Sequence, residues 1–215
     1  MNKAIDTFLE NLKQRKDVLG VIMFGSRARE NSRPDSDVDL VVILTEGFRR
    51  AVEYHDGQAF EIIYTTATGA LAYWESHLDD AAGLWEVAKV LYDRGGTVGH
   101  LKNQIQQVLD KGKKPIDEYQ LGQFRFDAED ILQYVEHIVD ADPTTANLVL
   151  TNKVFTLTEL FFDIRQMWIP APKQRMEKIK EISPGFYTFL TEFYGDKPIG
   201  ERLEIAKRIV PLVFE

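Results

Sequence analysis

The chain has 215 residues, 44% of them hydrophobic and 11% aromatic, which is enough for a packed core in one large domain or two small ones. It contains no cysteine, which excludes disulfides and thiolate metal sites, and it shows neither a signal sequence nor an apolar run of about eighteen residues, so we expect a cytoplasmic protein that does not enter a membrane. The formal net charge of −8 argues against binding to duplex nucleic acid, which usually requires a basic surface.

The first predicted elements are an amphipathic helix and a buried strand. Residues 3–15 place apolar side chains at helical spacing along one stripe. Residues 18–24 (VLGVIMF) then form an apolar run of strand length. Gly25 ends this run, because glycine permits backbone turns that a side chain would forbid.

The turn after this strand has the composition of a phosphate-binding site. Ser26 stands where we expect the N-cap of a short helix. Unpaired N–H groups and the positive end of a helix dipole bind anions at such a position. Arg27 and Arg29 add fixed positive charge beside it. The candidate nucleotide-binding residues of this turn are therefore Gly25, Ser26, Arg27 and Arg29.

Two aspartates open the next apolar run, residues 40–44 (LVVIL). Asp37 and Asp39 are two residues apart, so in a strand their carboxylates point to the same face. Two such carboxylates repel each other unless a proton or a cation lies between them, and Mg²⁺ prefers hard oxygen ligands. A solvated turn that leads into a buried strand is the alternative. The preceding strand and the Gly-Ser pair favour a metal site.

A third carboxylate is expected from a neighbouring strand. Residues 58–66 (QAFEIIYTT) are rich in aromatic and β-branched residues, which predicts a strand. Glu61 falls in the middle of this run, on the face opposite to Phe60 and Ile62. A charge there is costly unless it is paired or bound to a metal. A structural salt bridge is the alternative, and we favour Glu61 as the third metal ligand.

A linker is predicted to divide the chain near residue 112. Before it, residues 86–93 (EVAKVLYD) suggest a further strand and residues 101–109 a helix. Residues 111–115 interrupt the pattern, and their lysines are interpreted as part of a solvated linker. From residue 116 onward the periodicity is helical throughout. The boundaries of the two expected domains are therefore 1–112 and 113–215.

The second domain is expected to be a bundle of roughly four or five helices. The predicted helices cover residues 118–139, 146–167, 175–182, 185–194 and 200–213, and residues 169–173 form a rigid proline-rich connector before the third of them. The first helix carries an apolar stripe, interpreted as core: Phe124, Ala128, Ile131, Val135 and Ile138. A second, polar face of the same helix holds Asp127 and Asp130.

The motif resembles that of the nucleotidyltransferase superfamily with the DNA polymerase beta-like fold, and in particular the two-domain kanamycin nucleotidyltransferase-like enzymes. The residues that match are Gly25, Ser26, Asp37, Asp39 and Glu61. The resemblance implies an α+β fold, in which a mixed β-sheet nucleotidyltransferase core flanked by helices is followed by a C-terminal helical bundle. The chain departs from the family at Glu30, where a second glycine is common, and at Glu61, where aspartate is more frequent.

The resemblance also implies a chemistry and roles for individual residues. Two Mg²⁺ ions would be held by Asp37, Asp39 and Glu61, and a nucleoside triphosphate, with ATP as the default, would be the co-substrate. A carboxylate on the first long helix of the bundle would act as general base. Asp130 is the candidate for that role, ahead of Asp127 and Glu129, and an ordinary solvated helix face is the alternative. Lys173 is a candidate phosphate contact, with a surface lysine as the alternative.

The acceptor is the part of the reaction on which alternatives remain. A small molecule with a hydroxyl group, such as an aminoglycoside-like compound, fits the acidic composition, because negative fields concentrate cationic ligands. The alternatives are a protein or RNA acceptor, as in antitoxin-like nucleotidyltransferases, and an inactive scaffold that only binds nucleotides. By analogy with the family, the helical domain would wall the acceptor pocket, and a homodimer is a further expectation.

Overall fold

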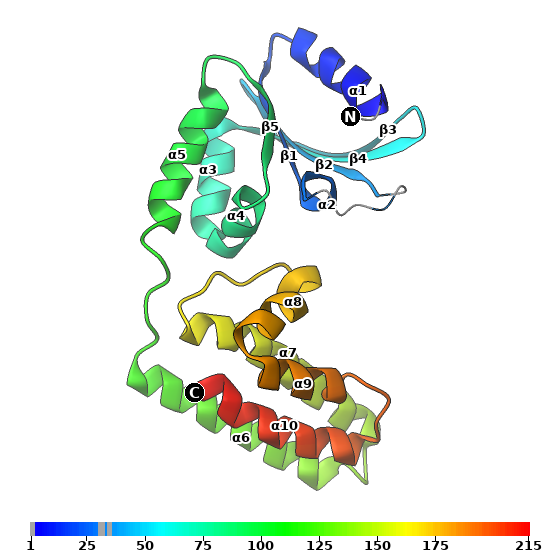
Figure 1. Ribbon diagram of the computed structural model, residues 1–215, viewed down its shortest axis with the longest axis vertical. Helices are drawn as coiled ribbons and strands as arrows, with labels where there is room; N and C mark the ends of the chain where they lie inside the picture. Colours follow the sequence, from blue (N-terminus) through cyan, green and yellow to red (C-terminus); the bar gives the residue numbers. More distant parts are fainter. Residues whose placement is uncertain (1–2, 30–32, 34–35) are drawn as a thin grey trace. The chain divides into compact units, whose positions relative to one another are not determined.

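The computed structural model describes residues 3–29, 33 and 36–215 (Figure 1). The chain divides into two compact units, Met1–Lys111 and Gly112–Glu215. Across the described residues, no helix has both the length and the apolar character needed to cross a membrane.

The first unit is built on a mixed five-stranded sheet in the order β3-β4-β2-β1-β5 (Figure 1). β2 and β4 run parallel, and the other neighbouring strands are antiparallel. The elements of this unit are α1 (Lys3–Gln14), β1 (Val18–Phe24), α2 (Gly25–Ala28), β2 (Val38–Leu44), β3 (Arg49–His55), β4 (Gln58–Thr66), α3 (Ala67–Ser76), α4 (Leu78–Trp85), β5 (Lys89–Asp93) and α5 (Thr97–Leu109). The predicted α+β fold with a mixed sheet is confirmed.

Each face of the sheet is covered by different helices. The apolar stripe of α1 packs on one face, where the rings of Phe8 and Phe60 lie 4.4 Å apart. α5 packs on β1 at the other face, close to Gly20: a Cβ atom there would lie 2.2 Å from a methyl carbon of Val98. Glycine is thus required at Gly20 by the close approach of helix and strand rather than by its backbone angles.

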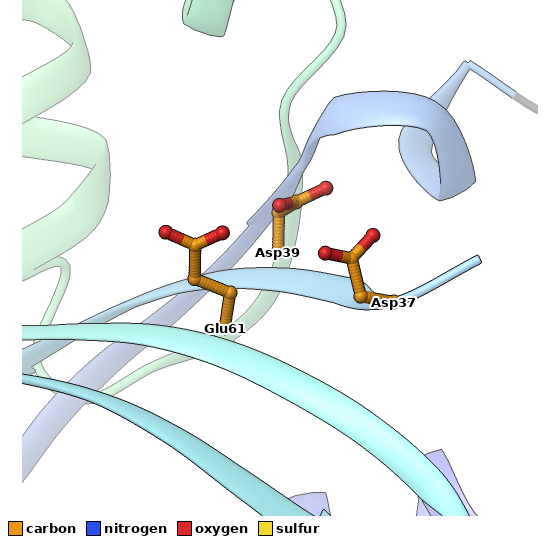
Figure 2. A group of neighbouring side chains, drawn as sticks. All are labelled: Asp37, Asp39 and Glu61. Atoms are coloured by element: carbon orange, nitrogen blue, oxygen red, sulfur yellow. The ribbon is translucent and has the colours of Figure 1, made fainter.

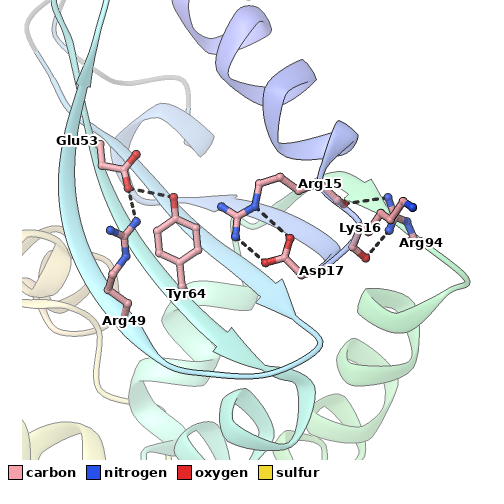
Figure 3. Close-up of polar contacts among 7 residues, drawn as sticks. All are labelled: Arg15, Lys16, Asp17, Arg49, Glu53, Tyr64 and Arg94. Atoms are coloured by element: carbon pink, nitrogen blue, oxygen red, sulfur yellow. Dashed lines mark hydrogen bonds and ion pairs between the residues drawn. The ribbon is translucent and has the colours of Figure 1, made fainter.

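Buried and exposed polar contacts hold the ends of these strands (Figure 3). Arg94, after β5, donates to the backbone carbonyls that join α1 to β1, including that of Lys16 at 2.8 Å. On β3, Arg49 donates to Glu53 at 2.6 Å, and the hydroxyl of Tyr64 donates to the same carboxylate oxygen at 3.1 Å. The residues Arg49 and Tyr64 are directly paired across β3 and β4, so this group lies on the sheet face opposite to Glu61.

Several elements of the first unit differ from the sequence predictions. The predicted strand at 86–93 begins only at Lys89, because the residues before it complete the end of α4. α3 and α4 were not predicted, and they are held together by the edge-to-face contact of Trp74 and Trp85, whose ring centroids are 5.2 Å apart. β3 was also not predicted: it is an edge strand whose charged side chains hide the alternation of a half-buried strand.

The second unit is helical, as predicted, and its described residues 112–215 form five helices (Figure 1). Their bounds are α6 (Glu118–Ile138), α7 (Pro143–Ile164), α8 (Pro172–Ile182), α9 (Pro184–Phe193) and α10 (Ile199–Phe214). Aspartate or serine caps three of them: the side chains of Asp117, Asp142 and Ser183 accept hydrogen bonds from backbone amides in the first turn. Proline follows the cap in α7 and α9, where its missing N–H costs nothing.

The core of the second unit is aromatic. Phe161, Phe162, Phe186 and Phe193 are fully buried. The predicted apolar stripe of α6 is correct at Ala128 and Val135 but wrong at Phe124, which is 42% exposed. The buried positions of α6 begin at Ala128 and continue through Leu132, so the packing partners of this helix within the unit meet its C-terminal half.

Candidate metal and nucleotide site

Three carboxylates meet on one face of the sheet, near the start of β2 (Figure 2). Asp39 lies on β2 and is paired with Glu61 on the parallel strand β4, while Asp37 immediately precedes β2. Asp37, Asp39 and Glu61 can each offer one oxygen such that the three oxygens lie within 4.8 Å of one another. We call these residues the acidic triad. The structure thus brings together the three side chains that were proposed from the sequence as metal ligands.

The donor set of the triad fits a hard divalent cation. Its ligands are all carboxylate oxygens, which Mg²⁺ prefers and softer metals do not require. Asp37 is exposed, and Asp39 and Glu61 are half-buried. Three negative charges this close repel one another, so binding a cation there relieves an unfavourable interaction. Because the triad is open to solvent, water or phosphate oxygens could fill the coordination positions of Mg²⁺ that the carboxylates do not occupy.

Glu61 also takes part in an ion pair, which was the alternative interpretation of this residue. Arg50 on β3 donates from Nε to Oε1 of Glu61 at 3.0 Å, and Nη2 contacts the same oxygen. This hydrogen bond raises the pKa of the Arg50 guanidinium above its usual value. Membership of the triad and the ion pair are therefore compatible in this structure.

The glycine of the Gly-Ser pair is required by the position of Asp39. Gly25 has φ of +69°, a left-handed conformation that side chains disfavour. A Cβ atom at this position would lie 1.9 Å from Oδ2 of Asp39. The turn that follows β1 therefore packs directly against a triad carboxylate, which places the proposed phosphate site beside the proposed metal site.

The predicted capping role of Ser26 is wrong. The short helix α2 begins at Gly25, one residue earlier, and the amide of its C-cap residue Arg29 donates to the carbonyl of Gly25 at 3.3 Å. Phe24 occupies the N-cap with extended backbone angles and makes no side-chain capping hydrogen bond. Ser26 accordingly lies within the first turn of α2, next to the glycine that contacts Asp39.

Both arginines of the turn are engaged by protein groups. Arg27 donates to the backbone carbonyls of Ser36 and Asp37 and to the side chain of Gln58. Arg29 reaches toward α4, where it contacts the carbonyl of Gly83 and the carboxylate of Glu86, each at 3.4 Å. Their expected contacts with phosphate stay predictions.

The remaining candidates lie elsewhere. Asp130 is an exposed residue of α6, and Lys173 is an exposed residue of α8, so both belong to the second unit. Asp127, an alternative to Asp130, is ion-paired with Lys153. Glu30, which occupies the place of a common family glycine, lies outside the described residues. The roles suggested for Asp130 and Lys173 stay predictions.

Sequence reasoning missed two residues at this site, Arg50 and Gln58. Arg50 belongs to the unpredicted edge strand, so nothing indicated that it would face Glu61. Gln58 opens β4 and is only 8% exposed, although a glutamine at the head of a strand is normally solvated. A buried amide of this kind needs hydrogen-bond partners, but its burial is seen only in the structure, so the sequence contains no signal for this residue.

Comparison with known proteins agrees with the fold. The family model described as "Nucleotidyltransferase domain" matches residues 5–159, which is more than half of the chain. The chain belongs to this nucleotidyltransferase family. The match begins at residue 5 and runs beyond Lys111 into α7, so it covers nearly all of the first unit and part of the second.

The individual proteins that the chain resembles are similar to it either over a short segment or at low sequence identity. A putative protein adenylyltransferase of Methanocaldococcus jannaschii is 39% identical over 57 residues, which cover 26% of this chain and 39% of that relative. A nucleotidyltransferase-like protein from Exiguobacterium sibiricum has the same fold, with a TM-score of 0.52 and 13% identity over 99% of this chain and 73% of its own. A spectinomycin adenyltransferase of Enterococcus faecialis, solved with ATP and spectinomycin, gives a TM-score of 0.37 and 12% identity over 97% of each chain.

Proposed function

We propose that this protein transfers a nucleoside monophosphate from a nucleoside triphosphate, with ATP as the default, to a hydroxyl group of a small-molecule acceptor in a Mg²⁺-dependent reaction. The observation that carries the proposal is the acidic triad, three convergent carboxylates of which Asp39 packs directly against the Gly25 turn. The membership of the chain in the nucleotidyltransferase family supports the same reaction class.

In the proposed in-line displacement, different residues bind the metal, bind the phosphates and accept the proton. Asp37, Asp39 and Glu61 would hold Mg²⁺, which when bound neutralises charge on the triphosphate. The Gly25–Ser26 turn would hold the outer phosphates, with Arg27, Arg29 and Lys173 as further candidates. In the reaction, the acceptor oxygen forms a bond to the α-phosphorus while the bond from that phosphorus to the bridging oxygen breaks. Pyrophosphate leaves, and the hydroxyl proton passes to a carboxylate, for which Asp130 is the candidate.

The class of acceptor is the finer part of the proposal. The net charge of −8 favours a cationic small molecule, such as an aminoglycoside-like compound, over a polyanion. A protein acceptor is the second candidate, favoured by the segment that is 39% identical to a putative protein adenylyltransferase. The presence of all three acids argues against the inactive scaffold. We keep the homodimer as part of the proposal for the small-molecule enzyme.

Label transfer from α-³²P-ATP tests the proposal. The purified protein is incubated with Mg²⁺ and either a panel of aminoglycosides or a fractionated cell extract, beside Asp39→Asn and the matched control Asp6→Asn on the exposed face of α1. We expect label in a small molecule, lost in Asp39→Asn and kept in Asp6→Asn. Label in a protein or RNA band would replace the small-molecule acceptor by the macromolecular one. Equal labelling by wild type and Asp39→Asn would refute the triad as the reactive centre.

A further inference from the structure

Asp37 differs from the other two triad residues in how it is held. Asp39 is paired on both sides in the sheet, with Phe24 on β1 and Glu61 on β4. Asp37 precedes β2, and the pairing of β2 with β4 begins one residue later, at Val38 (Figure 2). A metal ligand outside the ladder is not fixed by strand pairing, so other contacts must set its position.

Those contacts come from Arg27 and Gln58. Nε of Arg27 donates to the carbonyls of both Ser36 and Asp37 at 3.1 Å, and its Nη2 donates to the carbonyl of Ser36 at 2.6 Å. The same Nη2 donates to Oε1 of Gln58 at 2.8 Å, and Nε2 of Gln58 donates back to the carbonyl of Ser36 at 2.9 Å. We call this closed set of hydrogen bonds the Arg27–Gln58 clamp.

The clamp joins the three segments from which the site is built. Arg27 lies in α2, two residues after Gly25. Gln58 is the first residue of β4, the strand that also carries Glu61, and its side chain is buried. Ser36 and Asp37 form the entry to β2. Only a planar guanidinium offers several donors at fixed angles, so a lysine at this position cannot reproduce the pattern.

We propose, on the basis of the proposed function, that Arg27 is a positioning residue, which with Gln58 holds the backbone at Asp37 so that its carboxylate is ready to bind the divalent cation. Hydrogen bonds that orient metal ligands typically contribute 10- to 100-fold to metal affinity. The clamp thus assigns the first arginine of the Gly-Ser turn to the metal site. In this role its guanidinium donors hold the chain in place, which replaces the phosphate contact named above as a candidate role of Arg27.

Electrostatics and positioning predict opposite effects when Arg27 is removed. Loss of a positive charge beside three carboxylates would, by Coulomb attraction alone, strengthen the binding of a divalent cation. Loss of the clamp would weaken it, because Asp37 would no longer be held in place. A phosphate-binding arginine would leave the affinity of the nucleotide-free protein for metal unchanged or increased. Weaker metal binding therefore indicates the positioning role and distinguishes it from the other two.

The experiment measures Mn²⁺ binding to the nucleotide-free protein through the electron paramagnetic resonance signal of free Mn²⁺. The variants are Arg27→Gln, Arg27→Lys, which keeps the charge, and Gln58→Leu, which keeps the approximate volume. The matched control is Arg49→Gln, because Arg49 pairs with Glu53 on the opposite face of the sheet (Figure 3). Urea unfolding in EDTA establishes that each variant is folded.

We expect all three clamp variants to bind Mn²⁺ about 10- to 100-fold more weakly than wild type, and Arg49→Gln to bind it equally well. Unchanged or tighter binding by Arg27→Gln, or full rescue by Arg27→Lys, would overturn the clamp. If an Arg27 variant is unfolded, Gln58→Leu decides by the same criterion. Binding that is lost in Asp39→Asn but unaffected in the clamp variants would refute only this inference, whereas a wild-type protein that binds no Mn²⁺ would refute the proposed function as well.

Discussion

Two features of the structure require glycine at position 25, its left-handed backbone angle and its contact with Asp39, and replacing Gly25 by alanine tests both. The left-handed backbone angle costs a residue with a side chain about 1–2 kcal/mol. In addition, the new Cβ atom would lie 1.9 Å from Oδ2 and 2.7 Å from the carboxyl carbon of Asp39, so the carboxylate must rotate away. This second effect falls on a flexible side chain, so we expect it to disturb the triad more than the stability of the fold.

Gly57 provides the matched control. It has φ of +78° in the turn between β3 and β4, and a Cβ atom there would meet nothing within 4 Å. Gly57→Ala therefore carries the backbone cost alone. In urea unfolding followed by tryptophan fluorescence, we expect both variants to lose about 1–2 kcal/mol. In the Mn²⁺ binding assay, we expect only Gly25→Ala to lose affinity, by about tenfold or more, since one of three ligands is displaced.

Two results would refute this reasoning. If Gly25→Ala bound Mn²⁺ as well as Gly57→Ala, contact with the Gly25 turn would not fix the position of the Asp39 carboxylate. If Gly57→Ala lost as much affinity as Gly25→Ala, the loss would follow from general destabilisation of the sheet rather than from the displaced carboxylate.

Two further predictions test the packing and the electrostatics of the fold. Gly20→Ala should lower the free energy of unfolding in urea by about 1–3 kcal/mol, because its Cβ atom would lie 2.2 Å from a methyl carbon of Val98. Adding Val98→Ala should recover part of that loss, and strictly additive losses in the double variant would contradict the contact. Hydrogen bonds from Thr145 lower the pKa of Asp142 in the folded protein. The ionised Asp142 carboxylate therefore contributes its whole stabilisation above the unfolded-state pKa of about 3.9, and this stabilisation is lost as the pH falls through the lower folded-state pKa. The stability gap between wild type and Asp142→Asn should therefore narrow on acidification, and a gap independent of pH would contradict the assignment.

The strands that carry the triad could be predicted because their signals are local. β1, β2 and β4 are apolar runs, and the spacing of Asp37 and Asp39 places both carboxylates on one face whatever the rest of the chain does. That Glu61 would join them depended on β4 lying beside β2, which the resemblance implied and local pattern alone did not. The helices of the second unit were likewise found from their periodicity.

Contacts between distant segments could not be predicted in the same way. The side chain of Arg27 was expected to bind phosphate. In the structure it donates to the carbonyl of Ser36, nine residues later, and to the side chain of Gln58, 31 residues later, and no local pattern in the sequence indicates either contact. α3 and α4 were missed because Gly69 and Gly83 lower the helical signal of their segments, although tertiary packing of Trp74 and Trp85 stabilises them. Phe124 was assigned to the core because periodicity gives the direction of a helix face and not the length over which it is covered.

The place of β1 in the sheet has a consequence for synthesis on the ribosome. One edge of β1 pairs with β2, which follows closely in the chain, but its other edge pairs with β5, whose residue Tyr92 lies opposite Val21. The strand that leads into the Gly25 turn therefore keeps an open edge until most of the first unit has emerged. During that interval the nascent chain exposes an apolar strand to neighbouring chains. Slow elongation before residue 93 would lengthen the period in which this protein is most prone to aggregate.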